Sequence, residues 1–322
     1  MYILFSLILT FIITVILTLF FIKQRLYNFS SLIRDYTPKE HIKKNNTPTM
    51  GGIIIIASII INILLWSDIQ NNYIIIFLIN MLGFGFIGAL DDLMKIHKNK
   101  GITARIKFVL QCLIASFTFL CLYIFTPITP ILVFPFFSVN IGIFYFLWVL
   151  FIIVGTSNAV NITDGLDGLA STSIAINSSI FSVICFFLYL QHNNIQEFAV
   201  VTAIMAGACL GFLWFNAYPA KLFMGDVGSL SLGASIAFIA LITKTEIILL
   251  PFTGIIFVIE ILSVIMQVAS FKIRRKKIFK MAPIHHHFEI IGWPEQLITT
   301  RFSLVTLLSS LIALSLLLFF HS

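Results

Sequence analysis

Long apolar runs divide this sequence and constrain its fold more than any other feature. Each run holds about 18 to 22 residues with few or no charges, which is the length needed to cross a hydrocarbon core of ~30 Å as an α-helix. Only 10% of the chain is charged and 59% is hydrophobic, whereas soluble domains carry roughly 25% charged residues. The sequence therefore predicts an all-α, polytopic integral membrane protein.

The hydrophobic pattern predicts about ten spans, which begin near residues 1, 50, 73, 107, 141, 171, 198, 228, 248 and 302. We expect the first run to be retained as a span, because it has no basic start and no small-residue cleavage site before Lys23. The prolines between Thr126 and Asn140 indicate an external loop or small hairpin instead of a helix. No repeat or soluble second domain is visible, so residues 1–322 are expected to form one transmembrane domain.

Basic residues gather in alternate connections between the predicted spans. Residues 23–49 hold six Lys and Arg, 91–107 five, 215–227 one and 270–301 seven, and only Lys244 lies on the other side. Because basic loops stay in the cytoplasm, this bias predicts cytoplasmic long loops and two periplasmic termini. The net charge of +7 would also attract anionic membrane lipids and phosphorylated substrates.

Most of the acids share the basic side, although acids contribute little to orientation. Topology therefore does not explain nine of the thirteen Asp and Glu residues, which are Asp35, Glu40, Asp91, Asp92, Asp164, Asp167, Asp226, Glu289 and Glu295. We interpret this face as the functional one.

Asp91 and Asp92 are adjacent carboxylates at the end of the apolar stretch GFGFIGAL. A hard cation such as Mg²⁺ takes oxygen ligands, usually one or two carboxylates together with substrate phosphates and water. The pair could hold such an ion or accept a proton. A solvated helix end is the alternative, which is weakened because acids near a helix C-terminus oppose the macrodipole.

The segment NAVNITDGLDGLA places polar side chains at every third position, namely Asn158, Asn161, Asp164 and Asp167. In a helix or loose 3₁₀ turn they would share one face, which would suit sugar hydroxyls or a metal ion. The alternative is a polar turn, because the two glycines of the segment break helices easily. Two amides and two carboxylates at the end of a span favour the functional interpretation.

Two single carboxylates lie in apolar or glycine-rich surroundings. Asp226 sits in MGDVGS, where backbone can approach a ligand closely, so it is a candidate metal ligand; the alternative is an N-cap formed by Asp226 or Ser229. Glu260 lies inside the ninth apolar run, and an intramembrane carboxylate indicates a polar partner or a functional groove. Pro251 and Gly254 predict that this helix bends or breaks.

Histidines and lysines complete the candidate site. In APIHHHFE, at most one or two of His285, His286 and His287 can face the same group from a regular helix, and a histidine could donate to a diphosphate or act as a base. Lys44 precedes the glycine-containing block TPTMGG and would suit a phosphate, but snorkelling lysines flank many spans. Lys107 is either such an anchor or a site residue.

Taken together, five blocks of the chain resemble the phospho-N-acetylmuramoyl-pentapeptide transferase family, within the superfamily of polyprenyl-phosphate hexosamine-1-phosphate transferases. The blocks are TPTMGG, GALDDLMK, NAVNITDGLDGLA, FNAYPAKLFMGDVGSLSLG and APIHHHFE, and the resemblance runs from about Lys44 to Arg301. Two small departures are Asn45-Asn46 in place of the family's usual pair and a short N-terminus.

The resemblance implies a reaction in which UDP-N-acetylmuramoyl-pentapeptide and undecaprenyl phosphate give lipid I and UMP, with Mg²⁺ required. It also implies a homodimer in the bacterial inner membrane, an active site that faces the cytoplasm, and no nucleic-acid partner. By motif, Asp91 and Asp92 match the family's paired catalytic aspartates and Asp226 its metal-binding, catalytic aspartate. The matched substrate-binding residues are Lys44, Lys107, Asn161, Asp164, Asp167 and Asn216, Phe223 near the uridine, and His285, His286 and His287.

Other classes of protein explain the sequence less well. A secondary transporter would be expected to carry several mid-span carboxylates and an inverted repeat, but only Glu260 is well inside a span. A non-catalytic scaffold leaves the acidic motifs unexplained. Within the transferases, an enzyme that uses UDP-N-acetylglucosamine is the alternative.

Overall fold

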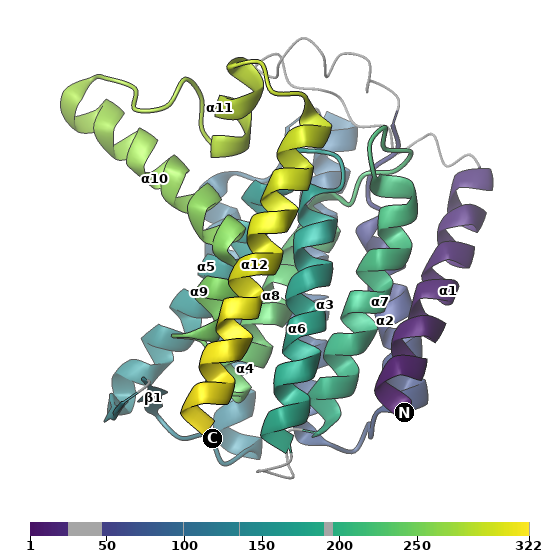
Figure 1. Cartoon of the computed structure of the whole chain (residues 1–322), viewed down its shortest axis with the longest axis vertical. Coiled ribbons are helices and arrows are strands. Elements are labelled where there is room, and N and C mark those ends of the chain that lie inside the picture. Colours follow the sequence, from purple (N-terminus) through teal and green to yellow (C-terminus); the bar gives the residue numbers. More distant parts are fainter. Residues whose placement is uncertain (25–46, 99, 135, 190–195, 322) are drawn as a thin grey trace.

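The chain folds as a bundle of membrane-length helices (Figure 1). The computed structural model describes residues 1–24, 47–98, 100–134, 136–189 and 196–321. In these ranges nine helices are long and apolar enough to cross a membrane, and a tenth apolar helix, α2, has 15 residues. The prediction of an all-α polytopic membrane protein is therefore confirmed.

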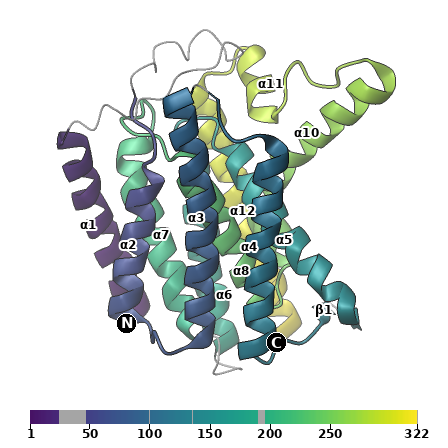
Figure 2. The ribbon, with the colours of Figure 1, turned by 180° about the vertical axis from the view of Figure 1, so that it is seen from behind.

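The helices that cross the bundle alternate in direction along the chain (Figures 1 and 2). The bounds of all helices, including the short α9 and α11, are α1 Tyr2–Lys23, α2 Gly52–Trp66, α3 Asn72–Lys98, α4 Ala104–Phe125, α5 Tyr145–Thr163, α6 Leu169–Tyr189, α7 Gln196–Asn216, α8 Gly225–Ile242, α9 Leu249–Thr253, α10 Ile255–Arg274, α11 Ile284–Ile290 and α12 Glu295–His321, with a 3₁₀ turn η3 at Gly142–Phe144.

One end of the bundle holds both termini and a small hairpin (Figure 1). Strands β1 (Ile131–Val133) and β2 (Ser138–Asn140) pair antiparallel, with Ile131 opposite Asn140. Lys244 donates to the carbonyl of Thr129 at 2.7 Å and to the hydroxyl of Tyr145 at 2.8 Å, which attaches the approach to the hairpin to the bundle. The predicted hairpin is confirmed, and the connections that precede α4, α8 and α11 lie at the opposite end of the bundle (Figure 1).

The ninth predicted span is broken, as its sequence indicates. Helix α9 ends at Thr253 and α10 begins at Ile255, on either side of Gly254. Helix α10 then leans away from the bundle and leads to α11 (Figure 2). The last span begins at Glu295, earlier than the predicted residue 302, because the polar first turn of α12 packs on the connection after α5, where the amide of Asp167 donates to Glu295 at 2.6 Å.

Helix α8 is the centre of the bundle, since every residue from Val227 to Leu241 is buried. Polar side chains of its neighbours bind its backbone: Asn80 Nδ2 of α3 donates to Ala234 O at 3.0 Å, and Ser157 Oγ of α5 donates to Leu230 O at 2.9 Å. Hydrogen bonds between helices and small residues at the crossings stabilise helix packing where no hydrophobic effect acts between spans. This packing fixes the position of the first turn of α8.

The crossing of α3 and α8 depends on Gly88. A Cβ atom on this residue would lie 2.5 Å from the backbone nitrogen of Val227 and would overlap the carbonyl group of Asp226. The two backbones can therefore approach this closely only because Gly88 has no side chain. This contact places the part of α3 that lies one turn after Gly88 next to the start of α8.

We expect Gly88→Ala to push α3 and α8 apart and to lower the free energy of unfolding by about 1–3 kcal/mol, the usual effect of overpacking. Thermal unfolding in detergent would measure the change. Gly155→Ala in α5 is the matched control, because a Cβ atom there would meet nothing within 4 Å. Equal melting temperatures for the two variants would contradict the importance of the crossing.

Candidate active site

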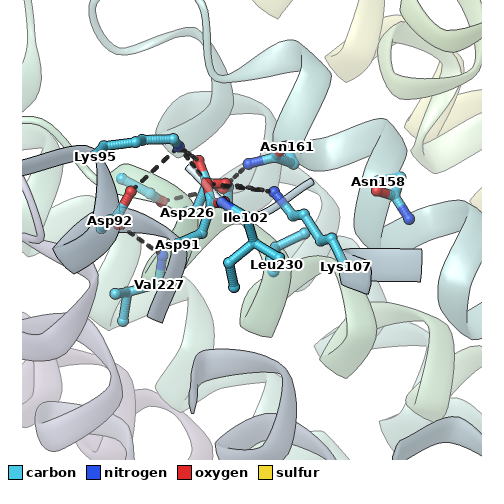
Figure 3. Close-up of polar contacts among 12 residues, drawn as sticks. Asp91, Asp92, Lys95, Ile102, Lys107, Asn158, Asn161, Asp226, Val227 and Leu230 are labelled. Atoms are coloured by element: carbon cyan, nitrogen blue, oxygen red, sulfur yellow. Dashed lines mark hydrogen bonds and ion pairs between the residues drawn. The ribbon is translucent and has the colours of Figure 1, made fainter. Parts of the chain in front are cut away.

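Three carboxylates meet where α3 crosses the start of α8 (Figure 3). One oxygen atom from each of Asp91, Asp92 and Asp226 lies within 4.8 Å of the others. Asp91 and Asp92 are only 3% exposed, and α3 continues beyond them to Lys98. The alternative of a solvated helix end is therefore wrong. Because buried carboxylates are costly without partners, the groups around them matter.

Backbone amides orient two of the carboxylates. The amide of Ile102 donates to Asp91 Oδ1 at 2.7 Å, and the amide of Val227 donates to Asp92 Oδ2 at 3.2 Å. Asp226 lies in the first turn of α8, and within the described residues this helix has no side-chain cap at its N-cap residue, Met224. The alternative that Asp226 or Ser229 serves only as an N-cap is not supported.

Two lysines neutralise much of this negative charge. Lys95 Nζ lies 2.6 Å from Asp91 Oδ2, 2.8 Å from Asp226 Oδ1 and 3.5 Å from Asp92 Oδ1. Lys107 of α4 donates to Asp226 Oδ2 and lies 3.9 Å from Asp91 Oδ2. Lys107 is thus a site residue and not only an anchor at the membrane surface.

Lys95 was not among the residues expected from the sequence. The sequence does contain a signal for it. Lys95 follows Asp91 by four residues and Asp92 by three, so that in a helix it lies on the same face as both. The pattern was hidden because a lysine in the last turn of a span is also a normal membrane anchor and a favourable partner of the helix dipole. Only its contact with Asp226, from a helix distant in sequence, distinguishes it.

The polar segment at the end of α5 divides between two neighbours instead of presenting one face. Asn158 Nδ2 donates to Gln111 of α4 at 2.8 Å, while Asn161 Nδ2 donates to Ser229 of α8 at 2.8 Å. Asn161 therefore adjoins the turn that carries Asp226, as Figure 3 shows.

Asp164 follows α5 directly as its C-cap residue. Burial raises the pKa of its carboxyl to about 8, and the nearby charges of Asp226 and Asp92 act in the same direction. Asp164 lies at the turn between α5 and α6, directly after the helix that carries Asn161.

Asp167 and Asn216 hold loops beside the cluster. Asp167 Oδ2 accepts the amide of Ala220 at 2.9 Å. Asn216 Nδ2 donates to the carbonyl of Leu222 at 2.9 Å, and its side-chain oxygen accepts from Ser171 at 2.6 Å. Both side chains are buried and shape the connection between α7 and α8.

The remaining predicted residues lie around this centre or outside the described ranges. The backbone of Phe223 pairs with Pro48 and Gly51, which joins the start of α8 to the entry of α2. Lys44 falls outside the described residues.

The three histidines of α11 point to different partners. His285 Nδ1 lies 3.0 Å from Glu260, His286 Nδ1 lies 2.6 Å from Glu289, and the ring of His287 accepts the amide of Lys280 at 3.1 Å. The expectation that they cannot all face one group is confirmed.

The donor set of the cluster is suited to a hard divalent cation. Carboxylate oxygens are the ligands that Mg²⁺ prefers, and it usually takes one or two of them with water and phosphate. Asp91, Asp92 and Asp226 supply three such groups in reach of one another, and the two lysines occupy the same carboxylates. The arrangement is chemically able to hold a cation together with an anionic substrate.

Comparison with known proteins defines first the class and then the family. The model of glycosyl transferase family 4 matches residues 74–244, which include α3 to α8 and the three carboxylates. The chain is thus a polytopic membrane protein of this transferase class. A phospho-N-acetylmuramoyl-pentapeptide-transferase signature matches residues 44–56.

Similar proteins of that name cover most of the chain. The relative from Thermodesulfovibrio yellowstonii is 48% identical over 88% of this chain and 83% of its own length. Those from Desulforapulum autotrophicum and Citrifermentans bemidjiense are 46% and 45% identical over the same shares. This chain belongs to the phospho-N-acetylmuramoyl-pentapeptide transferase family.

We expect Lys95→Met to raise the affinity of the substrate-free protein for a divalent cation by about tenfold or more, because Lys95 competes for the same carboxylates and one close ion pair is worth several kcal/mol near a protein surface. Titration with Mn²⁺, followed by electron paramagnetic resonance, measures the affinity. Lys98→Met is the matched control, since Lys98 is an exposed lysine of the same helix turn. Unchanged or weaker Mn²⁺ binding by Lys95→Met would contradict this assignment.

Proposed function

We propose that this protein transfers phospho-N-acetylmuramoyl-pentapeptide from its UDP-linked precursor to undecaprenyl phosphate, which yields lipid I and UMP for peptidoglycan synthesis. The observation that carries the proposal is the largely buried cluster of three carboxylates, with two partly exposed lysines, at one end of the bundle. Membership of the family, at 45–48% identity over most of the chain, supports the choice of substrates.

We further propose that the enzyme depends on Mg²⁺. Asp226 would hold the ion, with Asp91 and Asp92 within reach. A bound Mg²⁺ supplies positive charge that stabilises the diphosphate and the departing UMP. The three-carboxylate geometry supports this cofactor. Two lysines offset only part of the negative charge of three carboxylates, and a bound cation would offset the rest.

The reaction exchanges one phosphoric anhydride bond for another, so its barrier lies mainly in charge and positioning. Lys95 and Lys107 would attract and orient the phosphates, since their ammonium groups border the cluster. We assign Asp91 and Asp92 to positioning or deprotonation of the lipid phosphate. That phosphate is largely dianionic near neutral pH, with a second pKa of about 6, so the step does not require a strong base.

The surrounding polar groups would bind the nucleotide sugar. Asn161 adjoins the turn that carries Asp226 and Asp164 follows the same helix, whereas Asp167 and Asn216 would act by shaping the loop before α8. We propose Phe223 as a contact of the uridine, and the histidine motif and Lys44 as contacts of the substrate phosphates or sugar. These roles follow the family motifs, and for Phe223 also its backbone pairing at the start of α8.

The proposed setting is the bacterial inner membrane, with the carboxylate end of the bundle in contact with the cytoplasm. The basic residues support this orientation, because all but Lys244 lie in connections that the alternating spans assign to one side. Both termini would then be periplasmic, since Figure 1 places them at the opposite end. We also propose a homodimer, on the basis of the family resemblance alone.

The function is tested by UMP release from purified protein supplied with undecaprenyl phosphate, the UDP-linked muramoyl pentapeptide and Mg²⁺. We expect Asp226→Asn to reduce the rate about a thousandfold, because a metal ligand supports several kcal/mol of charge stabilisation. Asp68→Asn, which alters an exposed carboxylate at the other end of the bundle, is expected to stay within about twofold of wild type.

Two outcomes would contradict the proposal. Activity that survives removal of Mg²⁺ with EDTA would exclude the metal-dependent mechanism. Release of UMP with UDP-N-acetylglucosamine, but not with the muramoyl precursor, would assign the chain to the alternative substrate class.

A further inference from the structure

Glu260 is a fully buried carboxylate inside the membrane-spanning part of α10, with 0% of its surface exposed. Such a group is costly to bury and usually has a polar partner. Both partners come from the start of α11: the amide of Ile284 donates to Oε2 at 3.0 Å, and His285 Nδ1 lies 3.0 Å from Oε1. The carboxylate of a span is therefore connected directly to the histidine motif.

His285 is itself only 1% exposed. Its second ring nitrogen, Nε2, is buried and has no hydrogen-bond partner within the described parts of the chain, while Nδ1 lies close to Glu260 Oε1 without the alignment of a hydrogen bond. The ring packs on Gly165, where a Cβ atom would lie 2.7 Å from Cε1 and closer still to Nε2. One ring nitrogen of the histidine thus adjoins Glu260, and the other packs against the turn that begins with Asp164.

The other two histidines are held differently. His286 pairs with Glu289 within α11, and His287 accepts the amide of Lys280 in the preceding loop. Both contacts are local, at separations of three and seven residues. Within the described residues, His285 lies between Glu260 of α10 and the turn at Gly165.

A carboxylate beside one ring nitrogen fixes the orientation and tautomer of a histidine. We propose that Glu260 is a positioning residue, which holds His285 through Nδ1 so that the ring packs on Gly165 and sets the turn after Asp164 beside the bound nucleotide sugar. This role deepens the proposed function and rests on it. It also gives a role to Glu260, an intramembrane acid that the cluster on α3 and α8 does not use.

The test is a double-mutant cycle in the UMP-release assay. We expect Glu260→Gln, which keeps the size of the side chain, to lower kcat/KM for the nucleotide sugar about 10- to 100-fold, as for other carboxylates that orient a functional histidine. His285→Gln should lower kcat/KM at least as much. Since Glu260 acts through His285, the double variant should be no worse than His285→Gln alone.

A second variant approaches the ring from its other side. Gly165→Ala would displace the imidazole without changing the buried carboxylate, and its effect on kcat/KM should also disappear when residue 285 is already substituted by Gln. Glu246→Gln is the control for loss of a buried acid, since Glu246 is 2% exposed and lies in the connection after α8, at the opposite end of the bundle. It should leave kcat/KM within about twofold of wild type.

Provided that the wild-type enzyme is active, two results would overturn the inference. One is a double variant whose loss of kcat/KM equals the product of the losses of Glu260→Gln and His285→Gln, and the other is wild-type kinetics for either single variant. Wild-type protein that releases no UMP would instead contradict the proposed function, and with it this role of Glu260. Thermal unfolding of each variant identifies a loss of folded protein, and the cycle through Gly165→Ala then decides the outcome.

Discussion

The balance between three carboxylates, two of them buried, and two lysines is the interaction on which this structure depends. Asp91, Asp92 and Asp226 would repel one another strongly in low-dielectric surroundings, yet the crossing at Gly88 holds them together. Lys95 and Lys107 offset the repulsion. Such a cluster is suited to bind a cation together with phosphates, because the cation would neutralise the carboxylates and the phosphates would pair with the lysines.

Much of the architecture could be predicted because it depends on local sequence. Span length follows from the apolar runs, the break at Gly254 follows from Pro251 and the glycine, and the hairpin follows from the prolines after Thr126. The start of α12 could not be placed correctly. Its polar first turn is stabilised by a contact with Asp167, which is distant in sequence and invisible to hydrophobicity.

The site could be predicted in its residue types but not in its arrangement. Paired acids and glycine-flanked Asp226 are recognisable from local motifs, whereas the part played by Lys95 depends on a helix more than a hundred residues away. Regular spacing also misled in one case, because Asn158 and Asn161 turn to different helices. Likewise, only the folded chain shows that the partner of Glu260 is His285.

Location of a bound ion tests the central claim most directly. Crystals of the protein grown with Mn²⁺ in place of Mg²⁺ would reveal the ion by anomalous scattering. The account predicts one peak coordinated by Asp226 and at least one of Asp91 and Asp92, with the Lys95 ammonium withdrawn from the ion. An ion found elsewhere, or an unchanged Lys95 contact with Asp226 in the presence of saturating Mn²⁺, would contradict it.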